Sequence, residues 1–327
     1  MPLMQINAGP DGLTLHHARH SFLPLLRRCL RRPGPIVIML HGYKFAPGHP
    51  VSCPHNHILS LDPDRAGWKV KSWPRALGFG AGQRDEGVAI AFGWPARGTI
   101  WQACHEADRA AAQLADLLEI LAQLAPGRPV HLLAHSLGAR VVLRALPITC
   151  RASLGRIILL NGAEFGETAR AALESPAGAT AEFINVTTRE NDLFDFLLER
   201  LITPPKAGDS CLAQSLPACA NTLTLQLDHP ETIAALERAG FSLGTGSFRI
   251  CHWSAYLRPG VFDLYQALLR QPDLTKLERL RTALPSIPEP RWSRMMSLPR
   301  LPLRDRRPHA SATLTVDAPS HPVASTL

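Results

Sequence analysis

The segment Pro129-Val-His-Leu-Leu-Ala-His-Ser-Leu-Gly-Ala-Arg-Val-Val-Leu143 decides the fold, because it joins a buried strand to a helix through a tight turn. Residues 129–134 are apolar nearly throughout, as in a strand covered on both faces. Small residues, Ala134 and Gly138, stand two positions before and two after Ser136. A helix that folds back closely on its strand needs them there. The segment predicts a nucleophile elbow with Ser136 at its tip.

Other short β-type runs recur along the chain, each followed by a helical or irregular stretch. They are residues 35–40, 87–92, 156–160, 182–187 and 248–251. This alternation predicts the α/β class, with a mostly parallel central sheet covered by helices on both faces. Residues 99–125 have apolar side chains at helical spacing and end before Pro126-Gly127. We expect them to form the crossover helix between two strands.

One α/β domain is expected over residues 35–284. It carries two irregular insertions, at about 43–86 and 204–247, which we expect to roof a pocket at the strand ends. Residues 1–34 give only a weak signal for regular structure. Residues 285–327 carry many prolines and arginines without an apolar period, so we expect them to be disordered.

Composition limits the class of protein and its compartment. The chain has 327 residues, 46% of them hydrophobic, which is enough for a large core. The basic residues behind its net charge of +8 are scattered, so nucleic acid is not expected as a partner. Seven cysteines are too few for a disulfide framework, which favours a reducing cytoplasm. Apolar runs of only strand length predict no stable membrane insertion, and the N-terminus lacks a signal-peptide pattern.

Four motifs carry a family resemblance. Ala134-His-Ser-Leu-Gly138, with Ile36-Val-Ile-Met-Leu-His-Gly-Tyr43 about 95 residues upstream, resembles the α/β-hydrolase superfamily of esterases, lipases and thioesterases. Phe92-Gly-Trp-Pro-Ala-Arg-Gly98 and Ile157-Ile-Leu-Leu-Asn-Gly-Ala163 resemble strand ends of bacterial α/β-hydrolases without assigned substrates. The resemblance covers about residues 35–271. It implies the α/β-hydrolase fold and a serine-dependent esterase mechanism.

The resemblance also implies an oxyanion hole formed by the backbone N–H groups of Tyr43 and Leu137. Preorganised donors of this kind stabilise the developing negative charge by about 2.7–4 kcal/mol each. Gly42 would let the backbone approach the substrate closely. A tight strand exit is the structural alternative for His41 and Gly42.

The base and the acid follow the serine in this fold, each at a strand end. His252, directly after the predicted strand 248–251, is the expected base, in preference to His229 inside the second insertion. Asp192 follows the predicted strand 182–187 and is the expected orienting carboxylate.

Other carboxylates compete with Asp192 for that role. Glu164, after the preceding strand, and Asp195, close to Asp192, stay open as alternatives. A helix N-cap is the structural alternative for Asp192 itself, since Asp commonly caps helices.

Cys53, His55 and His57 have the residue types of a metal site. Their alternate spacing within one loop, with no distant partner pair, is not usual for zinc. We therefore expect no metal and no cofactor.

The function expected from the sequence is that of a serine hydrolase. It would cleave a small-molecule carboxylic ester or thioester through an acyl-enzyme on Ser136, with His252 and Asp192 completing a catalytic triad. An acyltransferase using the same triad and a non-catalytic hydrolase-like binding protein stay open, because fold does not fix function. No sequence pattern identifies the acyl group, the leaving group or the oligomeric state.

Overall fold

An eight-stranded sheet forms the centre of the molecule, with strand order β2-β1-β4-β3-β5-β6-β7-β8. A computed structural model describes residues 3–18, 20–64, 67, 69–244, 246 and 249–296, all within the unit Met1–Met296. The strands are β1 (Leu3–Gly9), β2 (Gly12–Leu15), β3 (Ile36–Leu40), β4 (Val88–Gly93), β5 (Val130–His135), β6 (Leu154–Leu160), β7 (Glu182–Thr187) and β8 (Thr222–Gln226). β2 pairs antiparallel with β1, and every other neighbouring pair is parallel. The predicted α/β class is confirmed.

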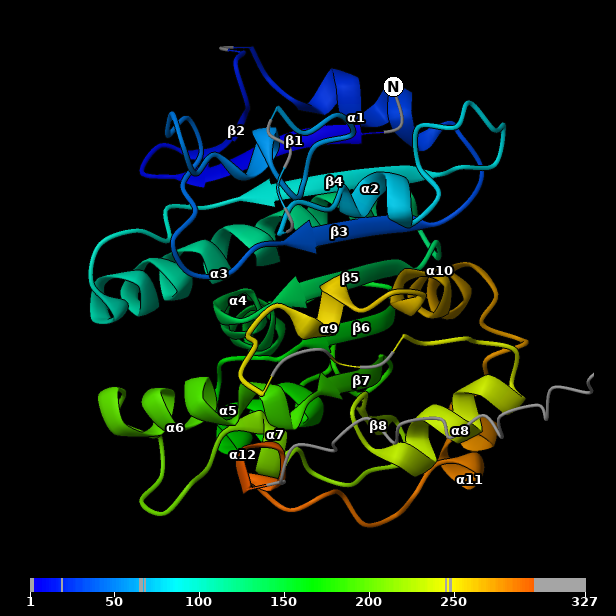
Figure 1. Cartoon of the computed structure of the whole chain (residues 1–327). Coiled ribbons are helices and arrows are strands. Elements are labelled where there is room, and N and C mark those ends of the chain that lie inside the picture. The colour runs from blue at the N-terminus through cyan, green and yellow to red at the C-terminus, as the bar shows by residue number, and fades with distance from the viewer. Residues whose placement is uncertain are drawn as a thin grey trace, which may run out of the picture. The chain divides into compact units, whose positions relative to one another are not determined.

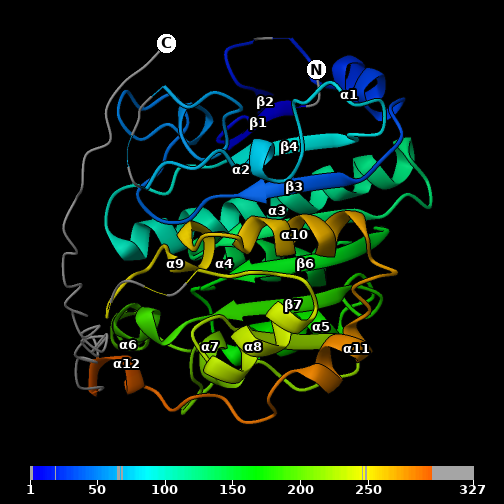
Figure 2. The ribbon, with the colours of Figure 1, turned by 45° about the vertical axis from the view of Figure 1, so that its right-hand side comes forward.

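Helices cover both faces of this sheet (Figures 1 and 2). The α-helices are α1 (Leu23–Leu30), α2 (Trp73–Ala76), α3 (Ile100–Leu124), α4 (Leu137–Ala145), α5 (Gly166–Glu174), α6 (Asp192–Leu201), α7 (Leu212–Ser215), α8 (Pro230–Arg238), α9 (Ser254–Leu257), α10 (Val261–Arg270), α11 (Leu277–Ala283) and α12 (Ser293–Met296). Short 3-10 helices are η1 (Pro54–Asn56), η2 (Leu146–Ile148) and η3 (Arg189–Asn191). In Figure 2, α3 runs behind the sheet, whereas α2, α9 and α10 lie in front of it.

The two faces of the sheet hold separate hydrophobic cores. Successive residues of a strand point to opposite faces, so β3 divides its five apolar side chains between them. Ile36, Ile38 and Leu40 join the core under α1, α3 and α4, while Val37 and Met39 join the core under α2 and α10. This double burial explains why β3 is apolar throughout.

The crossover helix α3 agrees with its predicted span. Thr99 caps its N-terminus by accepting a hydrogen bond from the backbone N–H of Gln102, whose side chain in turn accepts one from the N–H of Thr99. The helix ends before Gly127, whose φ of +73° lies in the left-handed region.

Three regions differ from the expectations. The N-terminal region is integral to the fold through β1, which pairs in parallel with β4 and packs apolar side chains into the core. The insertion 204–247, expected to be irregular, contributes the edge strand β8. The strand expected at 248–251 is wrong: its described residues, 249–251, form bends and coil. The edge of β7 that it would have needed is occupied by β8.

The expectation of disorder over 285–327 is wrong for its first part. Residues 285–296 are ordered and include α12, and the backbone N–H of Trp292 donates to Asp192 Oδ2 at 2.6 Å. Residues 297–327 lie outside the described part of the chain. Among the described residues, no helix has both the length and the apolar character needed to cross a bilayer.

Candidate active site

Ser136 lies in the sharp turn between β5 and α4, with φ 55° and ψ −126°. A positive φ is uncommon outside glycine, and strained backbone of this kind clusters at functional sites. The turn is fixed on both sides, because Ser136 N donates to Leu160 O at 3.1 Å and Ser136 O accepts from Ala163 N at 3.0 Å. Gly138 is required here: a Cβ at that position would lie 2.7 Å from His41 O. The predicted strand, turn and helix are therefore all present.

The turn after β3 covers the Ser136 side chain, which leaves only 4% of the residue exposed. A Cβ on Gly42 would lie 2.6 Å from Ser136 Cβ and 3.1 Å from Ser136 Oγ. The close backbone approach expected of Gly42 is thus present, and it is directed at the serine.

The predicted oxyanion donors flank this contact. Leu137 is the first residue of α4, where a backbone N–H has no partner within the helix. Tyr43 follows Gly42 and is anchored by its hydroxyl, which donates to Gly98 O at 2.6 Å. Among the described residues, neither Tyr43 N nor Leu137 N donates to a protein acceptor.

His41 holds the turn from inside the core. Its Nε2 accepts from Trp94 N at 3.1 Å, so its Nδ1 carries the proton and donates to Gly42 O at 2.9 Å. Burial lowers the pKa of His41 to about 4, which keeps the ring neutral at physiological pH. The trans peptide points the N–H of Tyr43 away from the bound Gly42 carbonyl. His41 thereby orients one of the two predicted oxyanion donors.

His252, the predicted base, is held beside the elbow by its own carbonyl. His252 O accepts from His135 Nε2 at 3.1 Å and from Asn161 Nδ2 at 3.1 Å. His135 directly precedes Ser136, and Asn161 directly follows β6, the strand that binds the Ser136 N–H. Burial lowers the pKa of His135 to about 4, so this imidazole is a neutral positioning group.

The His252 ring lies between two other rings. Its centroid is 4.7 Å from that of His135 and 4.6 Å from that of Phe194 in α6. This environment, chiefly through desolvation, holds the pKa of His252 well below 6.5, so the ring is neutral and able to accept a proton. The competitor His229 instead caps α8, where its Nδ1 accepts from Glu231 N at 3.1 Å.

An amide, rather than a predicted carboxylate, faces His252. His252 Nδ1 lies 2.6 Å from Asn191 Oδ1. Asp192, expected in this role, makes no hydrogen bond to His252 among the described residues. Its Oδ1 accepts from Arg189 Nη1 at 3.1 Å, and its Oδ2 accepts from Trp292 N. The 3-10 turn η3 brings Asn191, one residue earlier in the chain, to the base.

The two alternative acids occupy different surroundings. Glu164 is fully buried and binds Arg140 Nη1 at 2.8 Å, while Arg140 also binds Asp108 at 2.9 Å and 3.0 Å. It therefore forms an ion pair with α4 from the loop after β6. Asp195 lies behind Asn191, whose Nδ2 donates to Asp195 Oδ1 at 2.8 Å. Burial, reinforced by Asp192, raises the pKa of Asp195 to about 7.

Asn191 and Asn161 are the two site residues that sequence reasoning missed. Each lies just beyond the carboxyl end of a strand, β7 and β6 respectively, where site residues of α/β folds gather. This position at a strand end was the one sequence signal that could have indicated their role. Both side chains are amides, whereas the partner expected for the base was a carboxylate.

The discounted metal residues are bound up in local contacts. His55 Nε2 lies 2.7 Å from Asn7 Oδ1, and Cys53 Sγ lies 3.6 Å from His16 Nε2. In the portion of the chain that the structure describes, no three His, Cys, Asp or Glu side chains are grouped to hold a metal ion.

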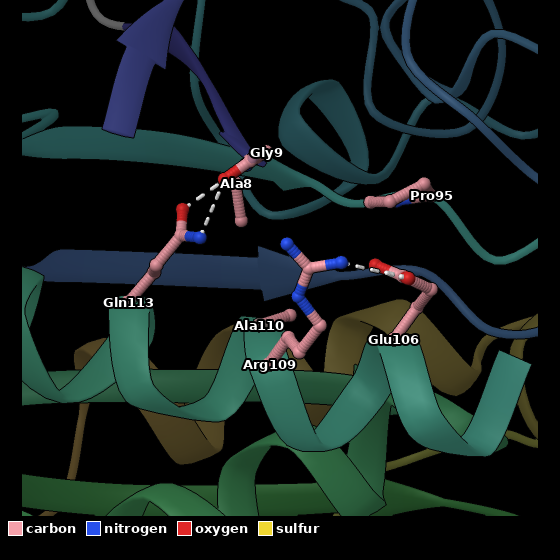
Figure 3. A pocket seen from close by; sticks show the side chains of 7 residues that line it. All are labelled: Ala8, Gly9, Pro95, Glu106, Arg109, Ala110 and Gln113. Carbon is pink, nitrogen blue, oxygen red and sulfur yellow. Dashed lines mark hydrogen bonds and ion pairs between the residues drawn. The ribbon is translucent and has the colours of Figure 1, made fainter. Parts of the chain in front are cut away.

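A small hollow lies between the end of β1 and α3, apart from these residues (Figure 3). Gln113 lines it, accepting from Gly9 N at 3.0 Å and donating to Gly9 O at 2.7 Å, and Arg109 pairs with Glu106 at 3.2 Å. The predicted catalytic residues do not contribute to the described lining of this hollow.

Solved structures with similar folds include three hydrolases, all distant. The propeptide form of the Bacillus licheniformis lipase BlEst2 is 12% identical with a TM-score of 0.42, covering 74% of this chain, and the chain spans about half (52%) of its length. Phospholipase PlaB from Legionella pneumophila is 13% identical with a TM-score of 0.38, covering 77% of this chain and 63% of its own. The RedJ thioesterase from Streptomyces coelicolor is 13% identical with a TM-score of 0.26, covering 55% and 80%. No curated protein has a matching sequence.

A family model matches the part of the chain that contains Gly42 and Ser136. Residues 30–154 match the family described as "Alpha/beta hydrolase of unknown function". The matched region contains β3 with the turn at Gly42, and β5 with Ser136 and α4. The match covers less than half of the chain, and over these residues the chain is similar to this family of α/β-hydrolases.

Proposed function

We propose that the chain is a serine hydrolase that cleaves a carboxylic ester or thioester through an acyl-enzyme on Ser136. One observation carries the proposal: the loop of His252 is tied by its carbonyl to His135 and Asn161, the residues that surround the strained Ser136 turn. A nucleophile, a neutral imidazole and two unpaired backbone N–H groups are the components that acyl transfer requires.

The proposed chemistry gives a separate task to each of these groups. His252 Nε2 takes the proton of Ser136 Oγ as Oγ bonds to the acyl carbon, and the oxyanion accepts hydrogen bonds from Tyr43 N and Leu137 N. The proton passes to the leaving alcohol or thiol, and the acyl–leaving-group bond breaks. Water then attacks the acyl-enzyme, with His252 acting again as base, and the acid product leaves.

A non-catalytic binding role is the second candidate, and one observation favours it. Within the described residues, no hydrogen bond joins Ser136 to His252, and Ser136 is buried. Catalytic hydrogen bonds in ligand-free sites are often long and tighten only with substrate, so the geometry is compatible with catalysis as well. Acyl transfer to another nucleophile would use the same groups.

Labelling with a fluorophosphonate probe separates catalysis from binding alone. We expect the parent chain to be labelled, because the probe phosphonylates only an activated serine, and we expect Ser136→Ala to lose the label. Ser153→Ala is the matched control, since Ser153 lies before β6 at the opposite end of the sheet. An unlabelled parent chain would favour the binding role, and labelled Ser136→Ala would refute the assignment of the nucleophile.

Aryl esters then test the reaction. Hydrolysis of a p-nitrophenyl ester series should be lost in Ser136→Ala and retained in Ser153→Ala. Product analysis with an added alcohol distinguishes hydrolysis from transfer, because transfer yields the new ester rather than the free acid.

A further inference from the structure

A line of hydrogen bonds runs from His252 away from Ser136 and ends at a buried carboxylate. His252 Nδ1 meets Asn191 Oδ1 at 2.6 Å, and Asn191 Nδ2 donates to Asp195 Oδ1 at 2.8 Å. Asn191 and Asp195 are each 2% exposed and lie four residues apart, which brings them to the same side of the chain at the start of α6. The proposed mechanism does not use Asp195.

The carboxylate fixes the orientation of the amide. An ionised Asp accepts hydrogen bonds only, so Asn191 must turn its NH₂ group toward Asp195. Its Oδ1 then faces His252 Nδ1, which must carry the ring proton in order to donate. His252 Nε2 is thereby left with a lone pair, the form that a base for Ser136 requires.

We propose that Asn191 is the positioning residue of this site, and that Asp195 acts through Asn191 to select the tautomer of His252 that accepts the Ser136 proton. This inference rests on the proposed function. Neither residue touches the reacting atoms. When His252 becomes an imidazolium, its Nδ1–H stays bonded to the amide, and the charge of Asp195 balances it from one residue further away.

Charged and titratable groups of four segments face Asp195. They are Asp192 and Glu199 of α6, Arg189 of η3, Arg291 before α12 and the Cys211 thiol before α7. Burial and the carboxylate of Asp192 outweigh the two arginines and raise the pKa of Asp195 to about 7. The second oxygen, Asp195 Oδ2, is buried and makes no hydrogen bond within the described residues.

Protonation of Asp195 releases the constraint. A carboxylic acid donates, so it can bind Asn191 Oδ1 and allow the amide to turn its NH₂ toward His252. His252 Nδ1 must then accept, which moves the ring proton to Nε2 and removes the base. Because the pKa of His252 itself is held well below 6.5, the activity should fall as the pH drops through about 7, before His252 is protonated.

Three variants of the full chain test this, with the fluorophosphonate labelling rate of Ser136 measured against pH. Asn191→Leu should lower the rate about 100-fold, because the tautomer is no longer selected and the imidazolium loses its hydrogen bond at Nδ1. Asp195→Asn should lose the acid limb, the fall in rate as the pH drops through about 7, because its amide oxygen accepts from Asn191 at every pH. At pH 9 it should react more slowly than the parent, because the charge that balances the imidazolium is gone. Asp192→Asn is the matched control, one residue from Asn191; it should retain an acid limb, shifted to lower pH because the Asp192 carboxylate no longer raises the pKa of Asp195.

The tautomer itself provides a readout that needs no activity. In ¹⁵N-histidine-labelled protein, with His252 assigned through His252→Gln, the His252 signals of the parent and of Asp192→Asn should report a proton on Nδ1 at pH 9. Those of Asn191→Leu should report a mixture.

The two results separate the two proposals. An acid limb unchanged in Asp195→Asn, or an Nδ1 proton retained in Asn191→Leu, would overturn the role of Asn191 and Asp195. Loss of labelling and of the limb in Asp192→Asn would return the role to Asp192. An unlabelled parent with the expected tautomers would refute the hydrolase proposal and leave the positioning inference standing.

Discussion

Gly42 lies so close to Ser136 that even a methyl group added at this residue would contact the candidate nucleophile. Its missing side chain leaves room for Ser136, and His41 binds its carbonyl from the core side. The peptide group between Gly42 and Tyr43 therefore has Ser136 on one side and a fixed hydrogen bond on the other. This peptide group cannot shift without moving either the elbow at Ser136 or the fully buried ring of His41.

Gly42→Ala should reduce the labelling rate of Ser136 at least tenfold, because its Cβ would lie 2.6 Å from Ser136 Cβ and 2.9 Å from His135 O. Gly9→Ala is the control, since a Cβ at Gly9 meets nothing within 4 Å. The measurement is the fluorophosphonate rate, with the thermal midpoint recorded in parallel. Equal rates in the two variants would show that the turn does not constrain Ser136.

Asp195 should also control stability as a function of pH. Its pKa rises from 3.8 in the unfolded chain to about 7 in the folded one, so between these values the folded state binds the extra proton and loses stability as the pH rises. Asp195→Asn should therefore be more stable than the parent above pH 7, by up to about 4 kcal/mol, since one pKa unit corresponds to about 1.4 kcal/mol. Urea unfolding at several pH values measures the difference, which should shrink toward zero near pH 4. A difference independent of pH would contradict a buried, titrating Asp195.

Helices α3 and α4 are joined by charge as well as by apolar packing. Arg140 of α4 binds Asp108 of α3 and, on its other side, Glu164 beyond β6. Glu164 is 0% exposed, and burial raises its pKa even beside Arg140. The ion pair compensates a charge that otherwise could not be buried, and it ties the helix behind Ser136 to its neighbours.

Arg140→Leu should destabilise the fold by about 3–5 kcal/mol, because it leaves the Glu164 charge buried and unpaired. Arg109→Leu is the matched control on α3: its pair with Glu106 is solvent-exposed and should contribute about 0–1 kcal/mol. Unfolding free energies from urea titrations compare the two. Similar losses in both variants would mean that Glu164 takes up a proton or finds another partner.

The elements themselves were predictable where burial on both faces makes a strand apolar. β3, β4, β5, β6 and β7 all have this property and were predicted within a few residues. β8 was missed because an edge strand is buried less completely: Thr224 is exposed, and the surrounding residues carry turn signals. Pairing with β7 decides which apolar segment becomes the next strand of the sheet. The residue pattern of one segment taken alone does not contain that information.

The fold and the elbow of the molecule were predictable from the sequence, whereas the residue that hydrogen-bonds His252 was not. The turn η3 places Asn191 toward the base and Asp192 toward Trp292, a difference of one residue within a tight turn. Four polar residues of this segment, Glu190 to Asp192 and Asp195, could each have faced His252. The outcome depends on Arg189 within the turn, and on Arg291 and Trp292, which reach the turn from elsewhere in the fold.

The candidate site is also spread over most of the chain, from Gly42 through Ser136, Asn161 and Asn191 to His252. During synthesis, the strand that ends at the serine leaves the ribosome more than a hundred residues before the histidine. A nascent chain that already carries the elbow therefore still lacks His252, the proposed base, and under the proposed mechanism it cannot attack an ester until His252 has been synthesised.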